Sequence, residues 1–124
     1  MNREDSALLV VDAQEKLLDI IPKKKRIVWN IRRLLDAANL LGVAVAATEQ
    51  YPDRLSPTLP ILKERIGSAP DKLCFSAGVC GEIFERWKDD GRSRVLVCGI
   101  ETHVCVLQTA FDLAAAGFEV FVPV

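Results

Sequence analysis

Short, continuous apolar runs alternate with longer segments of helical spacing along this chain of 124 residues. Uninterrupted apolar runs of about five residues are typical of strands buried on both faces of a parallel sheet. We predict strands at residues 7–11, 43–47, 72–76, 95–100 and 118–122. Strand–helix–strand repetition implies right-handed crossovers, so the predicted fold is α/β, with a parallel sheet covered by helices on both faces.

The segments between these runs carry apolar residues at helical spacing. We predict helices at residues 24–41, 79–89 and 102–116, closed by Gly42, Gly91 and Gly117. The stretch from Gln50 to Pro70 contains four prolines, so we expect it to be irregular, with one short helix around residues 59–66.

The composition is that of an ordinary globular domain. Half of the residues are hydrophobic and 27% are charged, and the length suits a single domain over residues 1–124. A net charge of −1 provides no basic face, which argues against a nucleic-acid partner. No apolar run is long enough to span a bilayer, so we expect no membrane contact.

Four cysteines, Cys74, Cys80, Cys98 and Cys105, do not have the spacing of a zinc site and are too sparse for a disulfide scaffold. The N-terminus lacks the basic start and apolar stretch of a signal peptide. We therefore expect reduced thiols and a cytoplasmic protein.

The sequence stops at Val124, at the carboxyl end of a predicted strand. Functional loops begin at such ends in a parallel sheet, so we expect that the natural chain continues or that the fold is trimmed at its C-terminus. The exposed edge of a shortened sheet favours a homo-oligomer.

Three residues with useful chemistry lie at predicted strand ends. Asp12 follows the first strand, Lys72 opens the third, and Cys105 lies just after the fourth, at the start of a helix. A thiol in the first helical turn lies near unpaired N–H groups, which stabilise a thiolate. A neighbouring Lys72 would lower the pKa of the thiol further, and Asp12 could accept its proton.

Each residue also has a structural interpretation. Cys105 could be a small residue that packs helix on sheet, Asp12 could cap the following turn, and Lys72 could be a surface lysine. His103 does not form a dyad with Cys105, because side chains two positions apart at a helix start diverge. The glycine-rich nucleotide motifs and the G-x-S-x-G elbow are absent from the sequence.

Three segments resemble the motifs of the isochorismatase-like cysteine hydrolases. They are Val-Val-Asp-Ala-Gln at 10–14, Lys-Leu-Cys-Phe-Ser-Ala at 72–77 and Gly-Ile-Glu-Thr-His-Val-Cys-Val at 99–106. They occur in the family's order, each at a predicted strand end. Thr-Glu-Gln-Tyr-Pro at 48–52 resembles one branch of the family. The resemblance covers almost the whole chain, but not the final strand and helices of a typical member.

The resemblance implies a three-layer, Rossmann-like parallel sheet and an Asp-Lys-Cys triad. Cys105 would attack a carbonyl carbon, Asp12 would take its proton, and Lys72 would hold the thiolate, giving a thioester that water hydrolyses. The backbone N–H groups of Glu101 and Cys105 would hold the oxyanion, beside a non-proline cis peptide at Ile100–Glu101.

The same resemblance implies that Gln14, Glu49, Gln50 and Tyr51 bind substrate. Nicotinamidases of the family carry an Asp/His metal site after the second strand. Residues 49–53 contain no histidine, so we expect no metal and no cofactor.

The presence of Cys105 favours hydrolysis of an amide or related C–N bond of a small molecule. Isochorismatases proper often lack this cysteine and use the aspartate as an acid on a vinyl ether. Two alternatives stay open: a vinyl-ether hydrolase, and a catalytically idle binding or assembly module.

Overall fold

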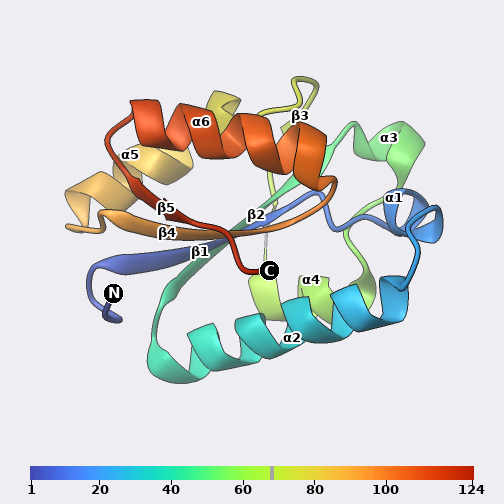
Figure 1. Cartoon of the computed structure of the whole chain (residues 1–124), viewed down its shortest axis with the longest axis horizontal. Coiled ribbons are helices and arrows are strands. Elements are labelled where there is room, and N and C mark those ends of the chain that lie inside the picture. Colours follow the sequence, from blue (N-terminus) through green and yellow to red (C-terminus); the bar gives the residue numbers. More distant parts are fainter. Residues whose placement is uncertain (68) are drawn as a thin grey trace.

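A five-stranded sheet forms the centre of the computed structural model, which describes residues 1–67 and 69–124 (Figure 1). The strand order is β3-β2-β1-β4-β5, and all four neighbouring pairs are parallel. The strands are β1 (Ser6–Val11), β2 (Ala44–Gln50), β3 (Asp71–Lys72), β4 (Arg94–Gly99) and β5 (Glu119–Phe121). This architecture confirms the predicted three-layer, Rossmann-like parallel sheet.

Helices cover both faces of the sheet. Figure 1 shows α2 and α4 on one side and α5 and α6 on the other. The helices are α1 (Glu15–Asp19), α2 (Lys24–Leu41), α3 (Pro52–Leu55), α4 (Pro60–Ile66), α5 (Gly81–Asp89) and α6 (Leu107–Ala115). A 3₁₀ turn (Ala77–Val79) precedes α5, and a π-helical turn (Thr102–Val106) precedes α6.

The central strand β1 is buried along its whole length. Leu9 and Val11 pack into the cluster beneath α5 and α6, whereas Leu8 and Val10 pack into the cluster beneath α2 and α4. Because successive side chains of a strand point to opposite faces, a strand covered on both sides needs apolar residues at every position. This requirement explains the continuous apolar run.

The helix α2 has the predicted bounds. Gly42 ends it in the left-handed conformation, with φ of 71°, and its N–H donates to the carbonyl groups of Ala38 and Asn39. The predicted C-cap is therefore confirmed.

Several boundaries differ from the prediction. β2 continues through Thr48 to Gln50, because these polar residues pair with β1 and β3 and are buried. β3 ends at Lys72 instead of beginning there, since the chain then turns so that carbonyl groups of the next residues contact the Lys72 ammonium. The short helices α1 and α3 were not predicted, and β5 spans only three residues.

Gly99, the last residue of β4, allows a close approach between β4 and β1. It adopts a φ of 128°, and a Cβ atom at this position would lie 2.0 Å from the carbonyl oxygen of Val11. The N–H of Ile100 donates to that same oxygen at 2.9 Å. Only glycine fits here, and the contact brings the carboxyl ends of the two strands together.

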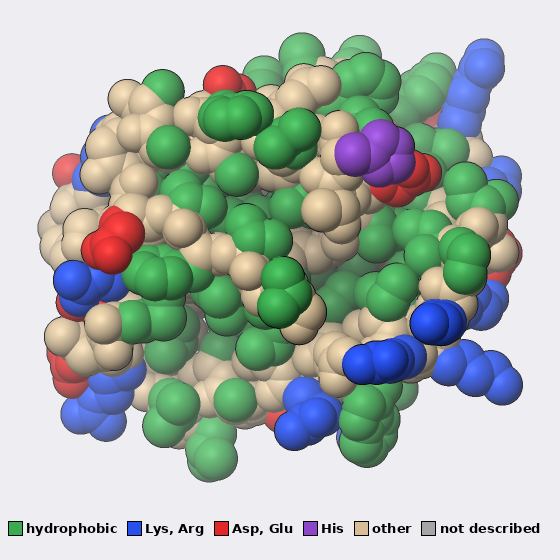
Figure 2. Space-filling model, viewed as in Figure 1, with side chains coloured by type: hydrophobic (Ala, Val, Ile, Leu, Met, Phe, Trp, Pro, Cys, Tyr) green, Lys and Arg blue, Asp and Glu red, His purple; other side chains and the backbone are tan. Residues whose placement is uncertain are grey.

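Apolar side chains remain exposed along α6, where Leu107 and Phe111 lie one turn apart. Figure 2 shows hydrophobic side chains gathered over this helix. Exposed apolar patches are typical of protein–protein contacts.

Candidate active site

The strand order reverses between β1 and β4. β2 and β3 follow on one side of β1, whereas β4 and then β5 lie on its other side. Ligands of open parallel sheets bind at the carboxyl ends of strands where the order reverses in this way. Asp12 follows β1 and Cys105 follows β4, and these two strands pair, so both residues lie at this point of the sheet.

Asp12 is completely buried and adopts the left-handed conformation, with φ of 51°. Its carboxylate accepts two hydrogen bonds. Oδ1 accepts from the hydroxyl of Thr48 at 2.9 Å, and Oδ2 accepts from Nζ of Lys72 at 2.7 Å. The carboxylate also lies close enough to the thiol of Cys105 to raise the pKa of that thiol. Asp12 thus connects the other two predicted triad residues.

The Lys72 side chain is fully excluded from solvent, so the interpretation as a surface lysine is wrong. Its Nζ donates to Oδ2 of Asp12 and Oε1 of Gln50, each at 2.7 Å, and contacts the carbonyl oxygens of Cys74 at 3.1 Å and Phe75 at 2.7 Å. Buried charges occur when they are paired and hydrogen-bonded, as this ammonium is.

Cys105 is only 6% exposed and lies in the π-helical turn. Burial raises the pKa of its thiol to about 11, and the hydrogen bond and negative charge of Asp12 add to this increase, whereas Lys72 lowers the pKa. The expected lowering of the thiol pKa is therefore wrong, because desolvation of the thiolate outweighs the nearby ammonium.

The pKa of Asp12 is raised as well, first by burial and against the opposing effects of Lys72, Cys105 and Thr48. A carboxylate with a raised pKa is a better proton acceptor than an exposed one. The resting site therefore pairs a protonated thiol with a strengthened base.

The peptide bond between Ile100 and Glu101 is cis, at the position that the motif predicted. The backbone N–H of Glu101 lies close enough to the thiol of Cys105 to lower its pKa. One of the two predicted oxyanion donors therefore lies beside the sulfur atom.

The four residues expected to bind substrate lie in different surroundings. Gln14 is completely buried, and its amide is occupied by the backbone of Gln50 and Ser56. The carboxylate of Glu49 accepts from the N–H of Thr58 and from Lys63. These contacts hold loops together and leave Gln14 no free polar atom for a ligand.

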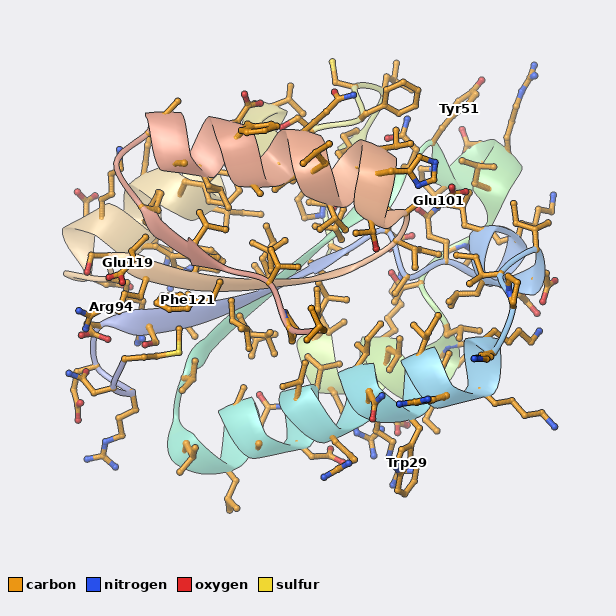
Figure 3. All side chains as sticks on the ribbon, in the orientation of Figure 1. Trp29, Tyr51, Arg94, Glu101, Glu119 and Phe121 are labelled. Carbon is orange, nitrogen blue, oxygen red and sulfur yellow. The ribbon has the colours of Figure 1, made fainter. Side chains whose placement is uncertain are left out.

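Tyr51 is partly exposed at the carboxyl end of the sheet. Figure 3 shows it at the same end of the molecule as Glu101, whereas Arg94 and Glu119 lie at the opposite end. Its position suits a substrate contact, which remains a prediction.

Residues outside the predicted set attach the lysine motif to α6. The N–H of Ala77 donates to Oγ1 of Thr109 at 2.8 Å, and Oγ of Ser76 donates to the carboxylate of Asp112 at 2.5 Å. The Ser-Ala pair of the motif thereby holds the loop after Lys72 against the helix that follows Cys105. Thr109 is completely buried, like Leu113 one turn later in α6. A polar residue at an apolar position of the helical pattern was the sequence signal that could have indicated this role.

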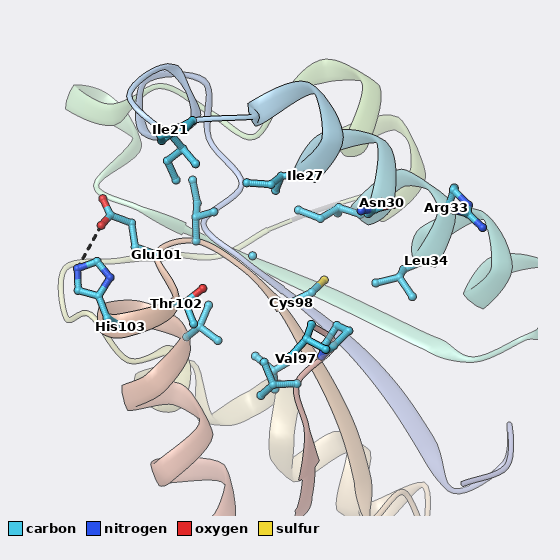
Figure 4. Close-up of a pocket in the computed structure, with 18 of the residues that line it drawn as sticks. Ile21, Ile27, Asn30, Arg33, Leu34, Val97, Cys98, Glu101, Thr102 and His103 are labelled. Carbon is cyan, nitrogen blue, oxygen red and sulfur yellow. Dashed lines mark ion pairs between the residues drawn. The ribbon is translucent and has the colours of Figure 1, made fainter.

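His103 lies on the surface, with its side chain 76% exposed and Nε2 at 3.5 Å from Glu101 (Figures 2 and 4). Among residues 1–67 and 69–124, no three His, Cys, Asp or Glu side chains gather closely enough to hold a metal ion. None of the helices in these ranges is long and apolar enough to cross a membrane.

A cavity of about 930 Å³ lies between α2 and the carboxyl ends of β4 and β5 (Figure 4). Its walls are mainly apolar, with Ile27 and Leu34 on one side and Cys98 on the other, and it reaches Glu101. Asp12, Lys72 and Cys105 do not line it. This cavity therefore reaches Glu101 and Val106, which flank Cys105 in the sequence, without containing the triad.

The chain is similar to known proteins in sequence and in fold. Isochorismatase domain-containing protein 2A of Mus musculus is 41% identical over 98% of this chain. The MAR1 ribonuclease of Caenorhabditis elegans has 42% identity and a TM-score of 0.88 over 98% of the chain. The YcaC gene product of Escherichia coli, described as an octameric hydrolase of unknown specificity, has 26% identity and a TM-score of 0.87 over 98% of the chain.

The chain spans 58% of the mouse protein, 64% of the worm chain and 63% of the bacterial chain. The model of the isochorismatase domain family matches residues 6–124. Together with the parallel sheet and the position of the three motifs, this match shows that the chain belongs to the isochorismatase family.

Proposed function

We propose that this chain provides the catalytic residues of a cysteine-dependent hydrolase, which cleaves an amide or related C–N bond of a small molecule through a thioester. The carboxylate of Asp12 carries the argument: it accepts from the ammonium of Lys72 at 2.7 Å and lies close enough to the thiol of Cys105 to affect its pKa, within one buried cluster. A nucleophile, its base and an orienting cation are the parts that covalent acyl transfer requires.

In the proposed reaction, Sγ of Cys105 attacks the amide carbon while its proton passes to Asp12. The C–N bond then breaks, and the leaving amine takes that proton. Water attacks the resulting thioester with Asp12 as the base, so that an acid is released and the thiol regains its proton. Lys72 remains charged throughout and keeps Asp12 oriented.

The high thiol pKa supports proton transfer during the attack over a thiolate formed beforehand. The N–H of Glu101 lies beside the sulfur atom, where the oxyanion would form, and we assign it and the N–H of Cys105 as donors. A donor of this kind typically contributes about 3–4 kcal/mol to the rate.

We keep the expectation of a homo-oligomer, which the octameric YcaC neighbour and the exposed apolar side chains of α6 support. One structural neighbour is named a ribonuclease, but the net charge of −1 favours a small molecule over RNA as the substrate. The cytoplasm and the absence of a cofactor remain expectations.

The test is a set of small primary amides assayed for ammonia release, with hydroxylamine present in a parallel series. Hydroxylamine diverts an acyl-thioester to a hydroxamate, so hydroxamate formation reports the proposed intermediate. Cys105→Ala should abolish both signals, whereas Cys98→Ala, which removes a buried thiol on the other face of the sheet, should retain them.

Three results would contradict the proposal. Turnover of a vinyl ether that survives in Cys105→Ala would indicate isochorismatase-type chemistry. Failure of every amide to give ammonia or hydroxamate would indicate an idle binding module. Cleavage of RNA without any hydroxamate would indicate a nuclease.

A further inference from the structure

We propose that Gln50 is a positioning residue, whose side-chain amide fixes the orientation of the Lys72 ammonium toward Asp12. This inference deepens the proposed function and rests on it. It replaces the substrate contact that the sequence suggested for Gln50, because both ends of the amide are already occupied within the protein.

The Gln50 amide holds two successive residues at once. Oε1 accepts from Nζ of Lys72 at 2.7 Å, and Nε2 donates to the carbonyl oxygen of Leu73 at 3.0 Å. The first contact orients the ammonium, and the second fixes the loop whose Cys74 and Phe75 carbonyl oxygens also contact it. One side chain thus contacts both Lys72 and the loop that supplies two of its other acceptors.

The other contacts of Lys72 explain why this orientation matters. An ammonium has three protons, and among its four acceptors only Asp12 carries a charge. The three neutral oxygens accept from two of the protons, and the third proton is directed at Oδ2 of Asp12. Without Oε1 of Gln50, three acceptors would remain for the three protons, and the ammonium would turn toward the carbonyl oxygens of Cys74 and Phe75 to reach them.

Gln50 is itself held by Gln14. Oε1 of Gln14 accepts from the backbone N–H of Gln50 at 2.6 Å, and Nε2 donates to its carbonyl oxygen at 2.8 Å. Nε2 also donates to the carbonyl oxygen of Ser56 at 2.6 Å. This pairing fixes the end of β2, so the Gln50 side chain starts from a rigid backbone.

The chemistry requires an amide at position 50. A glutamate would place a second negative charge on Lys72, compete with Asp12 for the ammonium, and lose the donor to Leu73. A methionine would keep the volume and lose both hydrogen bonds. The two substitutions therefore test the same role through different changes.

The experiment compares kcat, KM and the pH–rate profile of the whole chain in Gln50→Met, Gln50→Glu and a control. Gln108→Met makes the same chemical change at an exposed position of α6. We expect kcat of both Gln50 variants to fall at least about tenfold with little change in KM. The acid limb should move up by about half a pH unit or more, because a misdirected ammonium stabilises ionised Asp12 less.

A rise in KM with kcat and the pH profile unchanged would overturn the proposal and restore the substrate contact. If Gln50→Met fails to fold, the nearly isosteric Gln50→Glu provides the same readout. A second measurement, the pH profile of Cys105 alkylation assigned by peptide mapping, does not depend on enzymatic turnover. This profile should shift to higher pH in both Gln50 variants, and an unchanged profile would also overturn the proposal. Absence of turnover in the unmodified chain would count against the proposed function instead.

Discussion

The hydroxyl of Thr48 donates a buried hydrogen bond of 2.9 Å to Oδ1 of Asp12. Thr48 stands opposite Val11 in the β1–β2 pairing, and its backbone carbonyl accepts from the N–H of Asp12 at 3.1 Å. The same residue therefore fixes both the backbone and the side chain of the proposed base.

Replacing Thr48 with the similarly shaped valine should remove the hydrogen bond to Oδ1 of Asp12. Because the hydroxyl lowers the pKa of Asp12, Thr48→Val should raise it and move the acid limb of the pH–rate profile upward. Oδ1 of Asp12 would lose its hydrogen-bond donor, which should lower the unfolding free energy by about 1–3 kcal/mol, measured in urea.

Thr58→Val is the matched control. Its buried hydroxyl has no hydrogen-bond partner among the residues that the structure describes. This substitution should therefore leave stability unchanged or raise it slightly, and a loss as large as that of Thr48→Val would contradict the interpretation.

Removing the ammonium in Lys72→Met should destabilise the fold in a pH-dependent way. The buried carboxylate of Asp12 would lose its charged partner, at a cost of about 3–5 kcal/mol near pH 7. Protonation of Asp12 removes the unpaired charge, so the loss should be smaller at pH 5. Urea unfolding at both pH values measures this difference.

The double variant Asp12→Asn/Lys72→Met provides the control, because it contains no buried charge at this position. It should be more stable at pH 7 than Lys72→Met alone. Equal stabilities would show that the unpaired charge is not the cause.

The thiol of Cys105 should make the fold less stable in alkaline solution. Its pKa is about 11, whereas the ordinary value is 9.0, so the unfolded chain releases this proton at lower pH than the folded chain. The stabilisation is complete below pH 9 and is lost as the pH rises toward 11, at up to ~1.4 kcal/mol per pH unit.

Cys105→Ala should therefore flatten the decline in unfolding free energy between pH 9 and 10, measured with reductant present. Burial raises the pKa of Cys98 to about 12, so Cys98→Ala should flatten the decline as well. Replacement of the exposed Cys74 should have no such effect, and an effect as large as that of Cys105→Ala would argue against burial as the cause.

Gly99→Ala tests the close contact between β4 and β1. A methyl group would meet the backbone of Val11 at a distance that no side-chain movement can relieve. We expect a loss of about 3 kcal/mol or more, or failure to fold, measured by thermal unfolding. Gly91→Ala also places alanine at a positive φ but meets nothing within 4 Å, so its smaller loss isolates the contact.

The strands could be predicted from local patterns, and the grouping of Asp12, Lys72 and Cys105 from motifs that resemble those of a known family. Residues 7–11 and 95–100 are apolar without interruption, and Asp12, Lys72 and Cys105 belong to motifs with fixed spacing. The course of β2 through Thr48 to Gln50 could not be predicted, since burial of polar strand residues depends on partners far away in the sequence.

The thiol pKa of Cys105 was predicted in the wrong direction for a related reason. Its position after a strand and before a helix suggested stabilisation of a thiolate, but position does not reveal the depth of burial. The sequence likewise does not show that Gln14 uses its amide on the backbone of Gln50, because only the folded chain brings β1 and β2 to that register.

The separation along the chain between the clustered residues bears on how this molecule reaches its native state. Asp12 and Lys72 are 60 residues apart, and Cys105 lies beyond β4, which pairs with β1 across three crossovers. Closing such large loops is entropically costly, so contacts of this range form slowly. No fragment that lacks β1 or β4 can hold the cluster, and its appearance during refolding marks the assembly of the whole sheet.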